Sequence, residues 1–241
     1  MLRKALFGLV DLIYPKKCLA CSTRLKVDST NVFTCRACDQ AIKKNLPPFC
    51  HSCGRHLEKH ALTKNICPEC QRRKLYFDRA FSPCRYEGVI KELLHQFKYK
   101  GKDYLGAPLG KIMTEFIKEY SLPIDYLDSI VPVPLHNTKL REREFNQAKI
   151  LGETIAQSFQ KEIIDSALVR KRHTKAQAEL EKDQRFLNVA NSFTVSKESL
   201  IKDKNILLID DVLTTGATCS EAAKALKESG ANIVFVLTLA N

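Results

Sequence analysis

The clearest pattern of apolar and polar positions lies near the C-terminal end of the chain. Four consecutive aliphatic residues, 206–209, run directly into Asp210 and Asp211 and then into a short polar turn. An aliphatic run of this length, closed by a turn, is typical of a parallel strand that is buried on both faces. The residues after the turn, 217–229, have helical composition and are followed by Gly230, a common helix terminator. The pattern predicts a strand, a loop and a helix.

The rest of the C-terminal part continues this alternation. Apolar residues at helical spacing predict three helices, and apolar runs predict three further strands, of which one ends in prolines. The helices are expected at residues 89–97, 109–120 and 141–160, and the strands at 81–87, 130–134 and 232–239. This order predicts an α/β fold with a parallel sheet, whose strand-to-helix loops open at one edge.

The turn after residues 210–211 has the composition of a phosphate-binding loop. Backbone N–H groups and the positive end of the helix dipole favour an anion at such a turn. Gly216 lets the backbone approach a phosphate closely, and Thr214, Thr215 and Thr218 supply hydroxyl groups around Ala217. The GxxxxGK spacing is absent, which excludes a Walker-type triphosphate loop. An ordinary strand with an acidic helix cap is the alternative, but it does not explain this order of threonines and glycine.

Eight of the ten cysteines form four CxxC pairs, which indicates metal binding in a reducing, cytoplasmic compartment rather than disulfides. Two pairs make a tetrahedral four-thiolate shell that leaves no open position, so two structural Zn²⁺ ions are predicted. Sequential pairing is the simpler arrangement, and crossed pairing stays open. The predicted ligands are Cys18, Cys21, Cys35, Cys38, Cys50, Cys53, Cys67 and Cys70.

Positive charge is concentrated in the cysteine-rich part. Residues 1–80 contain 16 Lys/Arg and 6 Asp/Glu, whereas residues 81–241 contain 23 and 21. Two four-thiolate zinc sites lower the first segment to about +6, which still leaves it basic. At its end, Arg72, Arg73, Lys74 and Tyr76 combine cations with an aromatic ring, as single-strand-binding surfaces do. A linker whose aromatic residues dock on the next domain explains the same residues equally well.

The chain is expected to divide into three parts. Residues 1–14 are apolar on one side and are interpreted as a short docking helix rather than a signal peptide. Residues 15–80 form the double zinc-ribbon-like module, and residues 81–241 form the α/β domain. No apolar run approaches the roughly 20 residues of a membrane helix, so no stable membrane span is expected.

The segment ILLIDDVLTTGAT, residues 206–218, resembles the loop of type I phosphoribosyltransferases that binds phosphoribosyl pyrophosphate (PRPP). The resemblance implies a parallel sheet flanked by helices. It also implies that Asp210 and Asp211 hold the ribose hydroxyls, that residues 214–218 hold the 5-phosphate, and that Mg²⁺ accompanies PRPP. The second loop, with Leu135, His136 and Lys139, is expected to receive the pyrophosphate, with Arg141, Arg143 and Arg170 nearby.

The chain as a whole resembles the ComF/GntX family of competence-associated proteins. The resemblance is carried by VPVPLH (residues 131–136), LREREFNQA (140–148), FKYKG (97–101) and the spacing of polar residues in 174–188. One departure is Glu144, which stands where the family usually has glycine. The charged stretch 171–192 corresponds to a flexible loop that closes over PRPP in transferases of this fold, or else to a solvated linker.

Two functions remain open at this point. The resemblance implies a PRPP-binding protein that handles single-stranded DNA together with the uptake machinery in natural transformation. The alternative is an active phosphoribosyltransferase that uses Mg²⁺-PRPP and an unidentified small acceptor, with the zinc module as a structural hood. Nothing in the sequence shows an acceptor pocket, and fold and phosphate loop alone do not establish turnover.

Overall fold

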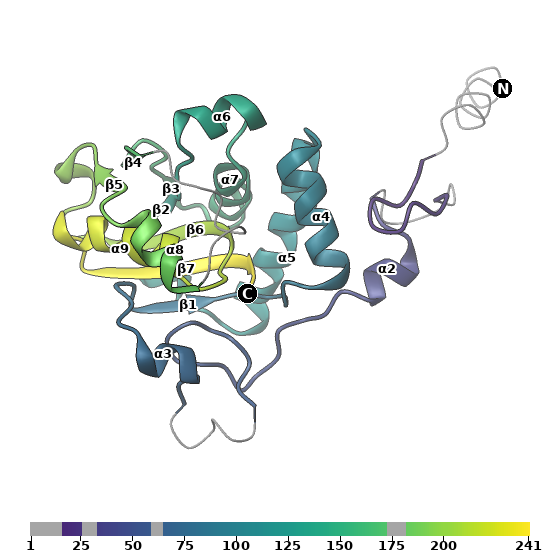
Figure 1. Cartoon of the computed structure of the whole chain (residues 1–241), viewed down its shortest axis with the longest axis horizontal. Helices are drawn as coiled ribbons and strands as arrows, with labels where there is room; N and C mark the ends of the chain where they lie inside the picture. Colours follow the sequence, from purple (N-terminus) through teal and green to yellow (C-terminus); the bar gives the residue numbers. More distant parts are fainter. Residues whose placement is uncertain (1–15, 26–32, 59–64, 173–181) are drawn as a thin grey trace.

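The computed structural model describes residues 16–25, 33–58, 65–172 and 182–241. The helix predicted for residues 1–14 lies outside these ranges. The described chain forms a parallel five-stranded sheet with helices on both faces, preceded by two cysteine-rich units (Figure 1). This architecture confirms the predicted α/β class.

The central sheet has the strand order β1-β7-β6-β2-β3, and all neighbouring strands are parallel. Residues 206–209 of the middle strand are all buried, and they alternate between the cores on the two faces. This explains why the run is continuously aliphatic. The strands are β1 (Arg79–Phe81), β2 (Ser129–Pro132), β3 (Glu162–Ile163), β6 (Asn205–Val212), β7 (Ile233–Ala240), and an antiparallel pair, β4 (Leu168–Arg170) and β5 (Phe193–Val195).

Each face of the sheet has its own helical cover. Helices α4 (Gly88–Tyr99), α5 (Gly106–Glu119) and α7 (Gln147–Phe159) bury their apolar sides on one face. Helix α9 (Ala217–Glu228) covers the other face together with the second cysteine-rich unit, and α8 (Lys182–Val189) lies beside α9. The shorter elements are α2 (Arg36–Gln40), α3 (Pro68–Arg72), α6 (Asn137–Arg143) and the 3₁₀ turns Asp103–Leu105, Ile124–Tyr126 and Glu198–Leu200.

The single helix expected at residues 141–160 is wrong, because the chain breaks it into α6 and α7. Glu144 ends α6 with φ +67°, a left-handed backbone conformation that residues other than glycine adopt only at a cost in free energy. The Asn146 side chain then accepts a hydrogen bond of 3.0 Å from the Ala148 N–H and starts α7. The left-handed conformation of residue 144 explains why glycine is usual at this position in the family that the sequence resembles.

Two other expectations need correction. The strand expected at residues 81–87 is wrong beyond Phe81, where β1 ends, and Pro83 brings no N–H group to extend it. Within the charged stretch 171–192, residues 182–189 are helical, and residues 173–181 lie outside the described chain. Among the described helices, none combines the length and the apolar character that crossing a membrane demands.

Candidate functional site

The eight paired cysteines gather into two groups of four. In each group the ligand atoms lie within 4.8 Å of one another, and the groups join the first CxxC pair with the second and the third with the fourth. The Sγ–Sγ distances Cys21–Cys35 and Cys53–Cys67 are both 3.7 Å. Four sulfurs at about 2.3 Å from a zinc ion lie about 3.8 Å apart in a tetrahedron. Both groups therefore fit a structural zinc ion, with sequential pairing.

The second four-cysteine unit, which contains Cys50, Cys53, Cys67 and Cys70, is built into the fold. The first three of these cysteines belong to the buried cluster beneath α9. Gly54 has φ +69° and lies so close to β1 that a β-carbon would overlap the carbonyl oxygen of Ala80. In Figure 1 this unit, marked by α3, lies beneath β1, whereas α2 of the first unit stands at the far end of the molecule.

The predicted phosphate loop follows β6 directly. Gly216 precedes α9 with φ +80°, a conformation that glycine adopts without strain. The first turn of a helix leaves its backbone N–H groups without intrahelical partners. The Thr215 hydroxyl accepts a 3.4 Å bond from the N–H of Ala217, which is buried at the start of α9. The turn thus has the arrangement that binds anions at helix starts.

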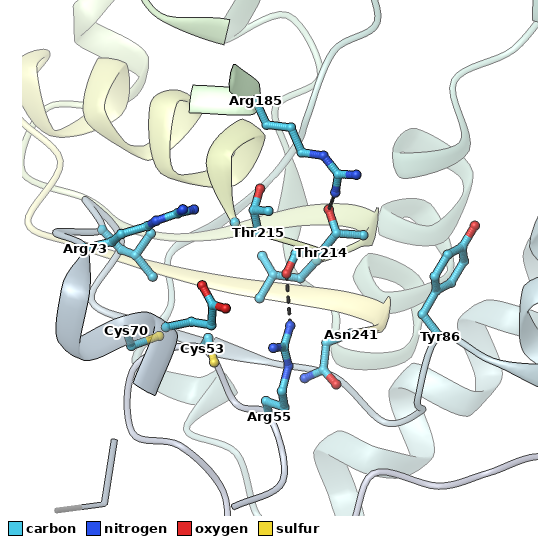
Figure 2. Close-up of a pocket in the computed structure, with 13 residues that line it drawn as sticks. Cys53, Arg55, Cys70, Arg73, Tyr86, Arg185, Thr214, Thr215 and Asn241 are labelled. Atoms are coloured by element: carbon cyan, nitrogen blue, oxygen red, sulfur yellow. Dashed lines mark hydrogen bonds between the residues drawn. The ribbon is translucent and has the colours of Figure 1, made fainter. Parts of the chain in front are cut away.

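Two arginines contact this loop at Thr214 (Figure 2). Arg55 of the second four-cysteine unit donates a 2.9 Å hydrogen bond from Nη2 to the carbonyl oxygen of Thr214. Arg185 of α8 donates from Nη1 to the hydroxyl oxygen of the same residue, at 3.4 Å. Segments far apart in the sequence therefore hold one residue of the loop.

The acid pair sits at the end of β6, and its two members have different surroundings. Asp211 forms a 2.8 Å ion pair with Lys98 of α4, and the side chains are 11% and 17% exposed. Burial opposes the charge of Lys98, but Asp211 outweighs it and the pKa of Lys98 is raised. Asp210 receives the N–H of Asp211 at 2.8 Å and the thiol of Cys219 at 3.6 Å. Burial, and secondly the charge of Asp211, raise the pKa of Asp210 to about 7.

A cleft of about 470 Å³ opens over the acid pair; we call it the large cleft. It brings together most of the residues predicted for PRPP, from both loops. Lining it are Leu135, His136, Lys139, Asp210, Asp211, Thr214 and Thr218. Within the second loop, His136 caps α6 by accepting the Thr138 N–H, and Lys139 pairs with Glu142 at 2.6 Å. Thr215 and Gly216 line a neighbouring cavity of about 330 Å³, the small cavity, together with Thr214.

The large cleft also contains Arg143 and Arg170, which were expected near the pyrophosphate, and three donors that the sequence did not assign to the site. These three are Lys98, Gln147 and Arg185. The Nε of Arg143 and the side-chain nitrogen of the buried Gln147 have no hydrogen-bond partner within the described chain. Such donors suit an anionic ligand in the cleft. Lys98 lies in the motif FKYKG and Gln147 in LREREFNQA, so these motifs were the sequence signal that could have pointed to them.

The residues predicted for nucleic acid lie beside the loop and not within the large cleft. Arg72 and Lys74 are exposed, and the guanidinium of Arg73 lies 4.9 Å above the ring of Phe186 in α8. Tyr76 is 41% exposed, while its backbone N–H donates to Ser220 of α9. The stretch therefore docks on the α/β part of the chain and still presents cations and a ring to solvent.

Two protein-family profiles match parts of this chain, and several known proteins are similar to it over most of its length. The profile described as a double zinc ribbon domain matches residues 9–74, and that of the phosphoribosyl transferase domain matches residues 148–241. Competence protein F of Haemophilus influenzae is 24% identical over 93% of this chain and 96% of its own. Competence protein ComFC of Bacillus subtilis is 29% identical over 88% of this chain and 89% of its own. The chain belongs to the ComF family.

Membership in the ComF family agrees with both halves of the structure. A further relative, the DNA utilization protein YhgH of Salmonella typhimurium, is 26% identical over 95% of this chain and 98% of its own. The ComF chain thus combines two zinc-ribbon-type four-cysteine sites with a phosphoribosyltransferase-type parallel sheet.

Proposed function

We propose that the protein binds PRPP in the large cleft and handles single-stranded DNA during DNA uptake in the cytoplasm. The observation that carries the first part is the composition of one cleft. An acid pair, Thr214 and Thr218 of the phosphate turn and several hydrogen-bond donors line the same 470 Å³ space. Volumes of this order suit a small-molecule ligand.

Each part of the cleft has a role in this proposal. Asp210 and Asp211 bind the ribose hydroxyls, and the turn at residues 214–218 binds the 5-phosphate. The Nε of Arg143 and the side-chain nitrogen of Gln147, which have no hydrogen-bond partner within the described protein, bind the pyrophosphate. Hard oxygen ligands such as these carboxylates suit Mg²⁺, which neutralises pyrophosphate charge when bound.

Calorimetric titration with Mg²⁺-PRPP tests the site. The wild type is expected to bind, and a variant with both Asp210→Asn and Asp211→Asn is expected to lose at least tenfold in affinity, because charged hydrogen bonds contribute about 1.5–3 kcal/mol each. Replacing two exposed acids outside the cleft, Glu115→Gln together with Asp125→Asn, controls for the loss of two negative charges. Equal PRPP affinity in the double variant and the wild type would contradict the site.

The DNA part of the proposal is supported by the names of the relatives and by the basic stretch at residues 72–76. Tyr76 lies between two lysines, with Lys74 and Lys224 at 5.8 and 5.7 Å from its ring. Fluorescence anisotropy with single-stranded DNA should show affinity that falls steeply with salt. Replacing Arg72, Arg73 and Lys74 by alanine should weaken binding, whereas replacing three exposed cations of the first unit, Lys16, Lys17 and Arg24, should change it less. No binding at low salt counts against this part.

Phosphoribosyl transfer to a small acceptor is the second candidate. The observation that favours it is the pKa of about 7 for Asp210, which allows proton exchange near neutral pH. Pyrophosphate release from Mg²⁺-PRPP in the presence of purine, pyrimidine or amine acceptors tests it. Release that persists in Asp210→Asn would exclude this role of the carboxyl group.

A further inference from the structure

The small cavity lies between the second four-cysteine unit and the loop that follows β6 (Figure 2). At about 330 Å³ it is large enough for one small ligand. No sequence pattern indicated it, because its walls come from segments that are distant along the chain. It is separate from the acid pair, which lines only the large cleft.

The charges in its wall decide which ligands suit it. A Zn²⁺ ion with four thiolates carries a net charge of −2. Together with one glutamate it balances three guanidinium groups, so the wall offers no excess charge to a pyrophosphate or another multiply charged anion. It does offer many hydrogen-bonding groups to a neutral ligand. The charged residues and zinc ligands concerned are Arg55, Arg73, Arg185, Glu69, Cys53 and Cys70.

Three wall residues, Thr214, Thr215 and Gly216, belong to the turn proposed for the 5-phosphate, and the others match a flat heterocycle. Leu75 and Leu213 supply apolar surface, and Tyr86 supplies an aromatic ring. The side-chain nitrogen of Asn241 is buried and has no hydrogen-bond partner within the described chain. Arginine forks, carboxylates and amides are the groups that pair with base edges, and tyrosine and arginine are groups on which bases stack.

We propose that the small cavity receives one unpaired base of single-stranded DNA. This inference rests on the proposed function and deepens it by naming the part of the strand that enters the protein. The exposed cations Arg72 and Lys74 flank Arg73 in the sequence and are placed to follow the phosphates outside. Since Tyr86, Arg185 and Thr214 line both cavities, the bound base lies beside the PRPP site.

The test compares a short fluorescent oligothymidylate with the same backbone made entirely abasic. For the zinc-loaded wild type, the intact strand should bind at least tenfold more tightly than the abasic one, since base stacking contributes about 1–3 kcal/mol per base. Asn241→Leu keeps the shape of the side chain but removes its donor, and it should weaken the intact strand by roughly tenfold. Its PRPP affinity should not change, because Asn241 does not line the large cleft.

Arg55→Ala provides a second variant, with Arg24→Ala in the first four-cysteine unit as the matched loss of one arginine. Only Arg55→Ala should weaken binding of the intact strand. Both variants should bind the abasic strand equally well, with only the small loss of affinity that removal of one positive charge causes. Equal binding of intact and abasic strands by the wild type overturns the inference. So does unchanged binding of the intact strand by an Asn241→Leu variant that retains two zinc ions. Absence of PRPP binding in the wild type would instead refute the proposed PRPP site and leave the base pocket standing.

Discussion

Replacing Asp210 by asparagine should stabilise the protein while it disrupts the proposed PRPP site. The folded-state pKa of Asp210 is raised from 3.8 to about 7, first by burial and then by the charge of Asp211. An acid with a raised pKa binds its proton more tightly in the folded state, so the free energy of unfolding falls as pH rises from about 4 to 7. Above pH 7 the full penalty is present, and a neutral asparagine removes it.

The magnitude follows from the size of this shift. It corresponds to about 4 kcal/mol at most, and because the carboxyl borders an open cleft, solvent reduces this to about 2–4 kcal/mol. For a chain of this length that raises the melting temperature by about 5–10 °C at pH 8. At pH 5 the gain should shrink to about 1–2 kcal/mol, because the folded wild type is then protonated.

Asp211→Asn is the matched control and should act in the opposite direction. It leaves the mostly buried Lys98 without its 2.8 Å partner, a loss that typically costs about 3–5 kcal/mol. Urea unfolding of the wild type and both variants at pH 5 and pH 8 gives the six free energies needed. A gain for Asp210→Asn that is equal at the two pH values, or a loss at pH 8, would refute the electrostatic reasoning.

Five further substitutions test three other parts of the structure. Glu144→Gly should stabilise the protein by about 1 kcal/mol in urea unfolding, because residue 144 is left-handed, whereas Glu142→Gly inside α6 should destabilise it by a similar amount. Cys35→Ser should cost one zinc ion, as measured by mass spectrometry, with little change in the main thermal transition. Cys53→Ser should cost one zinc ion and lower that transition markedly, since Cys53 is 8% exposed and belongs to the core beneath α9. Arg55→Ala should weaken PRPP binding by about fivefold in calorimetry, because the Thr214 carbonyl loses its 2.9 Å donor.

The parts that could be predicted were those with a local cause. The strand β6, the loop with Gly216 and the start of α9 follow one another in the sequence, so their geometry is set by neighbouring residues. Each CxxC pair is likewise formed by neighbouring residues, so the cysteines of the two zinc-type groups could be predicted. Sequential pairing could only be preferred over crossed pairing, because that choice depends on how two knuckles fold together.

The parts that escaped prediction depend on contacts between distant segments. In the sequence Lys98 stood out as part of the motif FKYKG, yet in the fold it neutralises Asp211, which lies far along the chain. The break at Glu144 was missed because glutamate suits a helix in isolation, and only the turn between α6 and α7 requires positive φ. Arg185 was assigned to a loop or linker, whereas α8 carries it to Thr214.

The second four-cysteine unit is best understood as a wall of the site and not as an appendage. Three consecutive residues join the four-cysteine group to the loop: Cys53 belongs to the group that fits a zinc ion, Gly54 packs against β1, and Arg55 bonds to Thr214. Zinc binding of this type contributes about 10–16 kcal/mol to folding, far more than the single hydrogen bond between Arg55 and Thr214 contributes. A bound zinc ion would therefore hold the segment that carries Arg55, which bonds to Thr214, a residue that lines both cavities. A ligand that displaces Arg55 would act on the proposed PRPP loop through the same bond, and reciprocity then requires PRPP to act on that ligand.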